Sequence, residues 1–168
     1  MNKPEPINTD KHASLPPGFL LNPVHFLAAG FGAGCVPKLP GTAGTVIGVI
    51  IYYPLQDADI RVYLGILISL IIAGIWICGK TARTLDVHDH SAIVWDEITG
   101  YLVTMFMAPA GWVWMIAGFI LFRLFDILKP WPISWVDRQV KGGIGIMLDD
   151  IIAGVFGLLT LQITAYLL

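Results

Sequence analysis

The sequence predicts an all-α integral membrane protein with about five membrane helices, including a hairpin over 91–129, plus an N-terminal interfacial or re-entrant helix. Composition is the first reason: 56% of the 168 residues are hydrophobic and 13% are charged, against about 25% charged residues in a typical soluble domain. The mean hydropathy of +0.74 agrees with this. The second reason is that Asp, Glu, Lys and Arg are absent from four long runs, 39–56, 62–79, 98–122 and 151–168.

Each of these runs is long enough to be tested as a membrane span, because a helix needs about 17–25 apolar residues to cross a bilayer. Lipid offers the backbone no hydrogen-bond partners, so we expect the runs to be helical. Pro109 and Gly111 interrupt the third run and divide it into the two helices of a hairpin. The membrane helices predicted in this way are 41–56, 62–80, 91–108, 112–129 and 149–168.

The amino-terminal part of the chain differs from these runs. The stretch 19–36 is apolar but contains Asn22, Pro23 and His25 together with several glycines, so we expect an interfacial or re-entrant helix there. Residues 1–18 contain four prolines and no apolar periodicity, which predicts a flexible arm. Residues 19–168 are then a single membrane-embedded domain.

The distribution of Lys and Arg predicts the orientation, because cytoplasmic loops are enriched in these residues. With five spans, the stretches 1–38, 80–97 and 123–150 share one side and carry nine of the ten cations, whereas Arg61 lies on the other side. The amino terminus and nearly all polar residues are therefore expected in the cytoplasm. The net charge of -2 leaves no cationic surface for a nucleic acid, and no such partner is expected.

The first candidate site segment is 86–97, which contains four acids and two histidines in twelve residues. Its last two acids, Asp96 and Glu97, are predicted to lie inside a hydrophobic helix about one turn below its polar end. Acids at membrane depth are costly and indicate a functional site. The alternative is a solvated helix start, where acids complement the positive end of the helix dipole.

The second segment carries Arg123, Asp126 and Lys129, which are three residues apart and so follow one helix face. The functional interpretation is a phosphate clamp made by Arg123 and Lys129 and oriented by Asp126. In the alternative interpretation, the cations extend toward the membrane interface and Asp126 forms a helical ion pair.

Two further segments contribute candidates. Asp149 and Asp150 follow a glycine-rich approach at the predicted start of the last helix, and two carboxylates bordering lipid suit Mg²⁺; they could equally complement the dipole. After Pro40, the backbone N–H groups of Gly41 and Thr42 begin a helix and could bind an anion of the substrate. The alternative there is close helix packing by small residues.

Together these segments place acids, cations and histidines at one membrane surface. Carboxylates around a hard cation, with Arg and Lys for the phosphate, are the groups that phosphoryl chemistry requires. The position implies a substrate with its head group at the interface and its tail in lipid.

Four motifs, within 30–42, 87–97, 122–133 and 142–154, occur in order along the chain. They resemble those of the bacterial phosphatidylglycerophosphatase A family. The resemblance implies an all-α fold with a central helix in the bacterial inner membrane. It also implies a Mg²⁺-dependent phosphatase that hydrolyses phosphatidylglycerophosphate to phosphatidylglycerol, so that the phospholipid substrate and the bilayer are the expected partners.

On chemical grounds we expect water to attack the terminal phosphomonoester. Four carboxylates are the expected ligands of one or two Mg²⁺ ions, namely Asp96, Glu97, Asp149 and Asp150. Asp89 is a further ligand or a proton acceptor. His88 or His90 would protonate the leaving alkoxide, and a structural role with a backbone partner suits either histidine equally. A covalent aspartyl-phosphate is left open, because spacing does not distinguish a ligand from a nucleophile.

Two other function classes fit the sequence less well. A small ion channel or transporter would place acids in both membrane halves, whereas here all but Asp57 and Asp59 are predicted on one side. A phosphatidyl transferase of the CDP-alcohol type has a signature that begins with Asp-Gly, and this chain contains no Asp-Gly. The sequence does not predict an oligomeric state.

Overall fold

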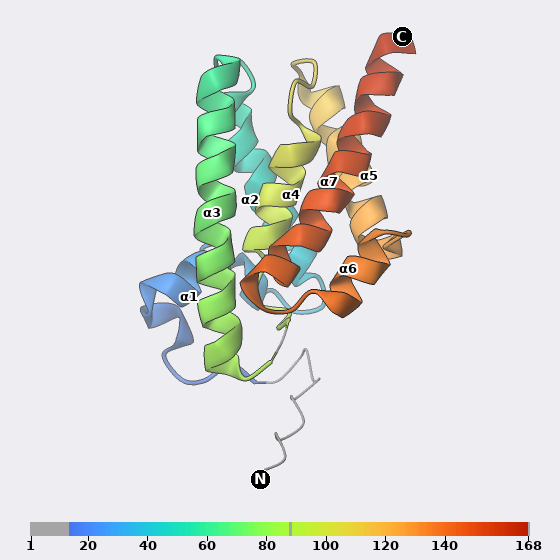
Figure 1. Ribbon diagram of the computed structural model, residues 1–168. Coiled ribbons are helices and arrows are strands. Elements are labelled where there is room, and N and C mark those ends of the chain that lie inside the picture. Colours follow the sequence, from blue (N-terminus) through green and yellow to red (C-terminus); the bar gives the residue numbers. More distant parts are fainter. Residues whose placement is uncertain (1–13, 88, 168) are drawn as a thin grey trace.

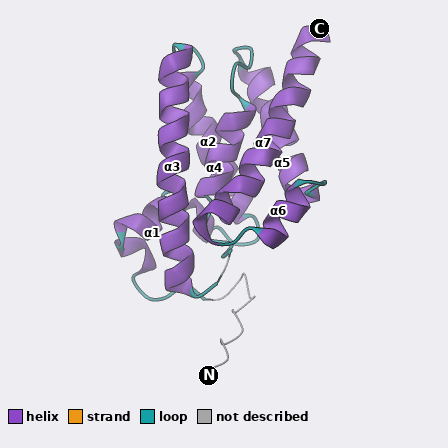
Figure 2. Cartoon of the chain, viewed as in Figure 1, coloured by secondary structure: helices purple, strands orange, loops and turns teal. Residues whose placement is uncertain are grey.

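The computed structural model describes residues 14–87 and 89–167, and the regular elements in these ranges are helices (Figures 1 and 2). The prediction of an all-α fold is therefore confirmed. Most of the expected flexible arm, residues 1–13, lies outside the described residues, and residues 14–18 form no helix.

The described residues form seven α-helices: α1 (Pro23–Ala28), α2 (Pro40–Tyr52), α3 (Ile60–Leu85), α4 (Trp95–Thr104), α5 (Trp112–Leu128), α6 (Ile133–Gln139) and α7 (Gly142–Leu167). Five of them, α2, α3, α4, α5 and α7, run lengthwise in alternating directions (Figure 1). The short helices α1 and α6 lie at one end, where α1 packs on α3 and α6 packs on α7. This alternation brings the three polar segments to the same end of the bundle.

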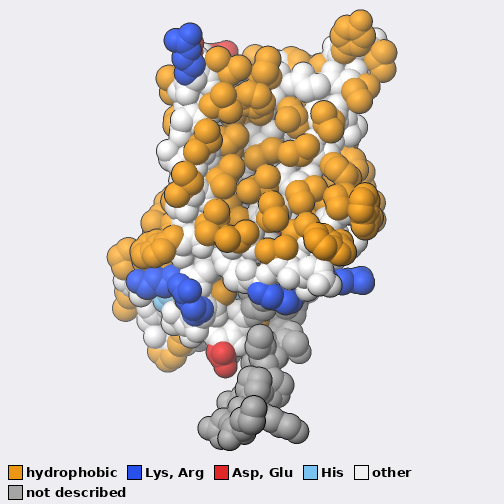
Figure 3. All heavy atoms as spheres, viewed as in Figure 1, with side chains coloured by type: hydrophobic (Ala, Val, Ile, Leu, Met, Phe, Trp, Pro, Cys, Tyr) orange, Lys and Arg blue, Asp and Glu red, His pale blue; other side chains and the backbone are white. Residues whose placement is uncertain are grey.

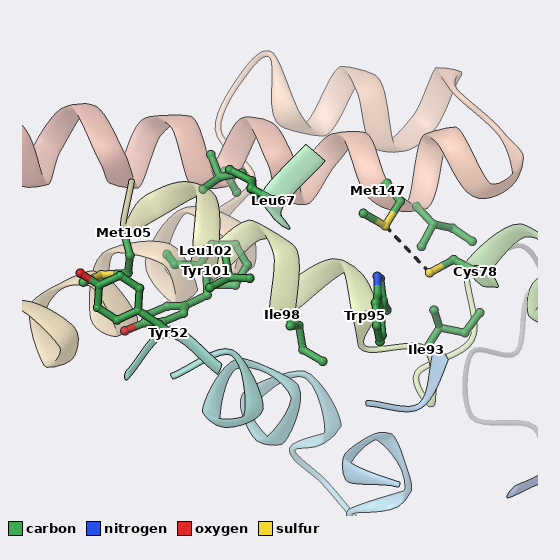
Figure 4. Packing of buried hydrophobic residues seen from close by; sticks show 14 of the residues in the cluster. Tyr52, Leu67, Cys78, Ile93, Trp95, Ile98, Tyr101, Leu102, Met105 and Met147 are labelled. Carbon is green, nitrogen blue, oxygen red and sulfur yellow. Dashed lines mark hydrogen bonds between the residues drawn. The ribbon is translucent and has the colours of Figure 1, made fainter. Parts of the chain in front are cut away.

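Helix α4 is the central helix that the resemblance implied. Nine of its ten residues are buried, and it contacts α2, α3, α5 and α7. Trp95, Ile98 and Leu102 of α4 lie in the core together with Tyr52 from α2 and Met147 from α7, as Figure 4 shows. Because α4 is enclosed by other helices, its side chains meet protein rather than lipid.

Hydrogen bonds to neighbouring helices fix the depth of α4. The indole N–H of Trp95 donates to the carbonyl oxygen of Leu70 on α3 at 3.0 Å. The hydroxyl of Tyr63, also on α3, donates to the carbonyl oxygen of Leu102 at 2.6 Å. Buried polar groups require such partners, so these contacts set the position of α4 along the bundle.

Helix α4 is shorter than the predicted helix 91–108. Its ten residues span about 15 Å, half of a hydrocarbon core of about 30 Å. It begins late because the Val94 N–H donates to the carbonyl oxygen of Ala28 in α1 at 2.9 Å, which holds the preceding residues out of the helix. After Thr104 the chain turns, and Met107 adopts a left-handed conformation at φ 57°.

Helix α7 begins at Gly142, seven residues before the predicted start at 149. Glycine disfavours helix on its own, but tertiary packing needs it here. A Cβ on Gly143 would overlap the carbonyl oxygen of Ile75 on α3. Asp149 and Asp150 consequently lie about two turns inside α7 and not at its start.

Within residues 14–87 and 89–167, two helices, α3 and α7, are long and apolar enough to cross a membrane. Each has 26 residues and spans about 39 Å. Figure 3 shows hydrophobic side chains spread over the lengthwise helices and cations gathered at the ends. Large apolar side chains such as Ile72, Ile120 and Ile163 are exposed on three different helices, which supports membrane association. The prediction of five membrane helices stays a prediction, because α2, α4 and α5 are shorter.

Close packing of α4 and α7 generates a stability prediction. A Cβ on Gly154 of α7 would lie 2.5 Å from the carbonyl oxygen of Gly100 on α4, whereas a Cβ on Gly65 of α3 would meet nothing within 4 Å. Overpacking costs about 1–3 kcal/mol, so Gly154→Ala should lower the melting temperature in detergent by about 2–10 °C. The control Gly65→Ala should leave it unchanged or slightly raised, since Ala favours helix. Equal melting temperatures for the two variants would contradict this packing.

Candidate active site

An acid-lined cavity lies at the end of the bundle where α6 packs on α7. Its volume is about 60 Å³. The lining comes from the segment after α3, the start of α4, the end of α5, and from α6 and α7; its residues are Asp89, Asp96, Glu97, Asp126, Lys129, Asp137, Gly145, Ile146, Asp149 and Asp150. We name this space the acid cavity. It brings together three of the four segments that the sequence singled out.

Three carboxylates in the acid cavity form a compact group. One oxygen each from Asp96, Glu97 and Asp150 lies within 4.8 Å of the others. The group exists because α4 and α7 approach closely, with Gly100 and Gly154 at the contact. Asp96 and Glu97 occupy the first turn of α4, and Asp150 comes from the interior of α7.

The group fits a hard divalent cation. Glu97 Oε2 and Asp150 Oδ2 are buried and have no hydrogen-bond partner among the described residues. Unpaired buried carboxylates repel one another and are costly unless a cation compensates them, and Mg²⁺ prefers oxygen ligands of this type.

The helix dipole accounts for part of this arrangement. Asp96 and Glu97 sit in the first turn of α4, where the dipole stabilises negative charge. Both are largely buried, however, and do not form the solvated helix start of the alternative interpretation. The dipole effect falls off within the first turn, so it does not explain Asp149 and Asp150, which lie farther along α7. A counter-charge is needed for them.

Lys129 supplies that counter-charge to Asp149. Its Nζ donates to Asp149 Oδ2 at 2.6 Å and to Asp137 Oδ1 at 2.7 Å. Two carboxylates within hydrogen-bond distance of Nζ offset the cost of burying the Lys129 ammonium. The other oxygen of Asp149, Oδ1, is buried and has no hydrogen-bond partner among the described residues. Asp149 thus differs from the three clustered acids.

Asp137 is a cavity residue that the sequence analysis missed. It lies on α6, seven residues of helix that follow Pro130 and Pro132, and the fold-back of α6 onto α7 places it beside Lys129. Pro130 and Pro132 were the sequence signal for this fold-back, because prolines cannot continue α5 and favour a turn after it.

Arg123 pairs with Asp126, as the helical spacing predicted. Its Nη1 donates to Asp126 Oδ2 at 2.5 Å and lies 4.0 Å from Glu97 Oε1. Only 16% of the Arg123 side chain is exposed, so it points into the protein and does not extend to the interface. Lys129 leaves the common face, because α5 ends at Leu128 and Lys129 is left-handed at φ 41°.

Gly41, in the first turn of α2, lies against these groups. A Cβ there would overlap Glu97 Oε1 and lie 3.0 Å from Arg123 Nη1. Thr42 is partly buried and does not line the acid cavity. Gly44 and Gly48 instead pack against α4 and the residue before it, as the small-residue interpretation proposed.

The two histidines are placed differently. His88 lies outside the described residues. His90 is buried, and its Nδ1 accepts a hydrogen bond from the Ala92 N–H at 3.1 Å. In the neutral ring the hydrogen is therefore on Nε2. His90 does not line the acid cavity, whereas Asp89 does.

Comparison with known proteins gives one consistent family. Residues 26–165 match the family model described as Phosphatidylglycerophosphatase A. The chain is 45% identical over 135 residues to Phosphatidylglycerophosphatase A of Escherichia coli (strain K12), covering 80% of this chain and 78% of that protein. It is 40% identical over 152 residues to Phosphatidylglycerophosphatase A of Haemophilus influenzae, covering 88% and 91%.

A third relative carries a different name. It is a Bacteroides thetaiotaomicron protein, provisionally named a phosphatidylinositol-3-phosphatase, and it is 34% identical over 160 residues, covering 90% of this chain and 98% of that protein. No solved structure matches the chain.

Proposed function

The chain belongs to the phosphatidylglycerophosphatase A family and is a phosphatase, and we propose that it hydrolyses phosphatidylglycerophosphate to phosphatidylglycerol and inorganic phosphate with Mg²⁺ as cofactor. The observation that supports the cofactor most strongly is the group formed by Asp96, Glu97 and Asp150, in which buried oxygens of Glu97 and Asp150 have no hydrogen-bond partner among the described residues. The two cationic side chains beside this group, Arg123 and Lys129, support phosphate as the reacting group.

In this proposal Asp96, Glu97 and Asp150 hold the metal, and Asp149 contributes its Oδ1 to the same set. When bound, Mg²⁺ neutralises charge on phosphate oxygens and favours deprotonation of water. Asp149 has a second task, because its Oδ2 keeps Lys129 at the rim of the cavity.

The remaining groups position the phosphate and move protons. Arg123 and Lys129 bind phosphate oxygens, and Asp126 orients Arg123 by its ion pair. The backbone at Gly41 and Thr42, next to Arg123, adds N–H donors at the start of α2.

The reaction then requires one bond to form and one to break. Water oxygen bonds to phosphorus while the bond from phosphorus to the glycerol oxygen breaks. Asp89, which lines the cavity, accepts the proton of the attacking water. His88 donates a proton to the leaving alkoxide. The hydrogen bond from Ala92 to His90 favours a structural role for His90.

We also propose that the site faces the cytoplasm from within a multi-pass inner-membrane protein. Trp95, which precedes Asp96 and Glu97, packs against Gly74 of α3. Lys80 lies six residues after Gly74 on α3, about 9 Å along the helix axis. The acids are thus recessed from the level of an exposed cation, Lys80, that stacks on Trp76 at 5.1 Å. A lipid lying in the bilayer can present its terminal phosphate at this depth.

The proposed reaction is tested by phosphate release from phosphatidylglycerophosphate in mixed micelles, using detergent-purified protein. We expect release with Mg²⁺, arrest by EDTA, and recovery when Mg²⁺ is restored in excess, because the carboxylates require a cation. Phosphatidylinositol 3-phosphate is the comparison substrate, chosen for the third relative, and should react more slowly. Folded protein that releases no phosphate from phosphatidylglycerophosphate, or releases it equally in EDTA, would contradict the proposal.

Substitution of the clustered acids tests the site itself. Asp150→Asn should lower turnover about 100-fold or more, and Asp149→Ala should abolish turnover. Both variants should stay in the membrane and elute from size-exclusion chromatography as the wild-type protein does. Asp57→Asn is the matched control, since Asp57 is an exposed acid near the opposite end of α3, and it should keep full turnover. Near-normal turnover in both site variants would refute the metal site.

A further inference from the structure

A second cavity lies at the same end of the bundle as the acid cavity and is not used by the mechanism above. Its volume is about 260 Å³, and it lies between the last turns of α3 and the start of α7. Arg83 and Lys141 contribute cations to its lining, Asp86 contributes one acid, and Ala82 and Val87 contribute apolar surface. We name it the α3–α7 cavity.

The two cavities are lined by residues that lie close together in the sequence. Asp86 and Val87 line the α3–α7 cavity, and Asp89, two residues farther along, lines the acid cavity. Gly143 lines the α3–α7 cavity, and Gly145 lines the acid cavity. Neighbouring residues of the same two short stretches of chain therefore line the two cavities, which places both at the same end of the bundle.

The charge of the α3–α7 cavity suits a singly charged anion. The ion pairs between described residues involve Arg123 and Lys129, and Arg83 and Lys141 belong to none of them. Two cations and Asp86 give a formal charge of +1. Clustered Arg and Lys without carboxylate partners are suited to bind phosphate oxygens.

The apolar surroundings indicate that this anion belongs to a lipid. Ile144 follows Gly143 directly and is 55% exposed, and Trp76 on α3 is 57% exposed. A ligand with its charged group between Arg83 and Lys141 would thus have apolar surface nearby for its acyl chains.

We propose that the α3–α7 cavity binds the phosphodiester of the same lipid whose terminal phosphomonoester is hydrolysed in the acid cavity. This inference rests on the proposed function, because phosphatidylglycerophosphate carries both groups, separated by one glycerol unit. The product keeps the phosphodiester and loses the monoester. Arg83 and Lys141 are therefore substrate-positioning residues that also bind the product.

The test compares Arg83→Gln, Lys141→Gln and the double variant with wild-type enzyme in mixed micelles. The apparent KM for phosphatidylglycerophosphate should rise about three- to tenfold in each single variant, with kcat within about twofold. The inhibition constant of phosphatidylglycerol should rise in parallel, because it shares the phosphodiester. The inhibition constant of inorganic phosphate, which binds in the acid cavity, should not change.

Arg138→Gln is the matched control, because Arg138 is an exposed cation at the same end of the bundle that lines neither cavity. The inference is overturned if this control raises KM as much as the cavity variants, if the cavity variants lose kcat with KM unchanged, or if phosphate and phosphatidylglycerol inhibition weaken together. Absence of turnover in the wild-type enzyme would instead overturn the proposed function.

Discussion

The close contact between α4 and α7 is the constraint on which the rest of the site depends. Gly100 and Gly154 allow the two backbones to approach, and the Thr104 hydroxyl donates across the contact to the Gly154 carbonyl oxygen at 3.2 Å. In a membrane, where lipid is as apolar as the side chains, such small-residue contacts and polar bonds drive helix association. The same contact places Asp150 of α7 beside the acids that begin α4.

This packing concentrates negative charge that protein cations balance only in part. Lys129 forms ion pairs with Asp149 and Asp137. Arg123 forms an ion pair with Asp126, and its Nη1 lies 4.0 Å from Glu97 Oε1. The buried carboxylate oxygens without a hydrogen-bond partner among the described residues belong to Glu97, Asp149 and Asp150. An arrangement of this kind is unfavourable on its own. In the function proposed above, a divalent cation and a phosphate would offset this cost, and this is how the fold would lead to the proposed chemistry.

The sequence predicted the all-α fold and placed α2, α3 and α5 to within about five residues at either end. This was possible because runs without charged residues and a Pro/Gly break are local signals in the sequence. The start of α4 was misplaced, because it is set by a hydrogen bond from the Val94 N–H to the carbonyl oxygen of Ala28, which is distant in the sequence. The start of α7 was misplaced, since glycines that disfavour helix locally are required by the contact with α3. Most candidate site residues could be recognised in the sequence because they are charged residues next to apolar runs. The position of Asp137 in the acid cavity could not, because it depends on how α6 folds back onto α7.

Direct cation binding tests the central claim, that the α4–α7 contact builds a divalent metal site. Mn²⁺ favours the same oxygen ligands as Mg²⁺, and the electron paramagnetic resonance signal of free Mn²⁺ reports binding to detergent-purified protein without any turnover. We expect saturable binding of about one or two ions per chain and a loss of affinity of about tenfold or more in Glu97→Gln, with Asp57→Asn unchanged. No saturable binding to folded wild-type protein, or equal binding to Glu97→Gln, would contradict the account.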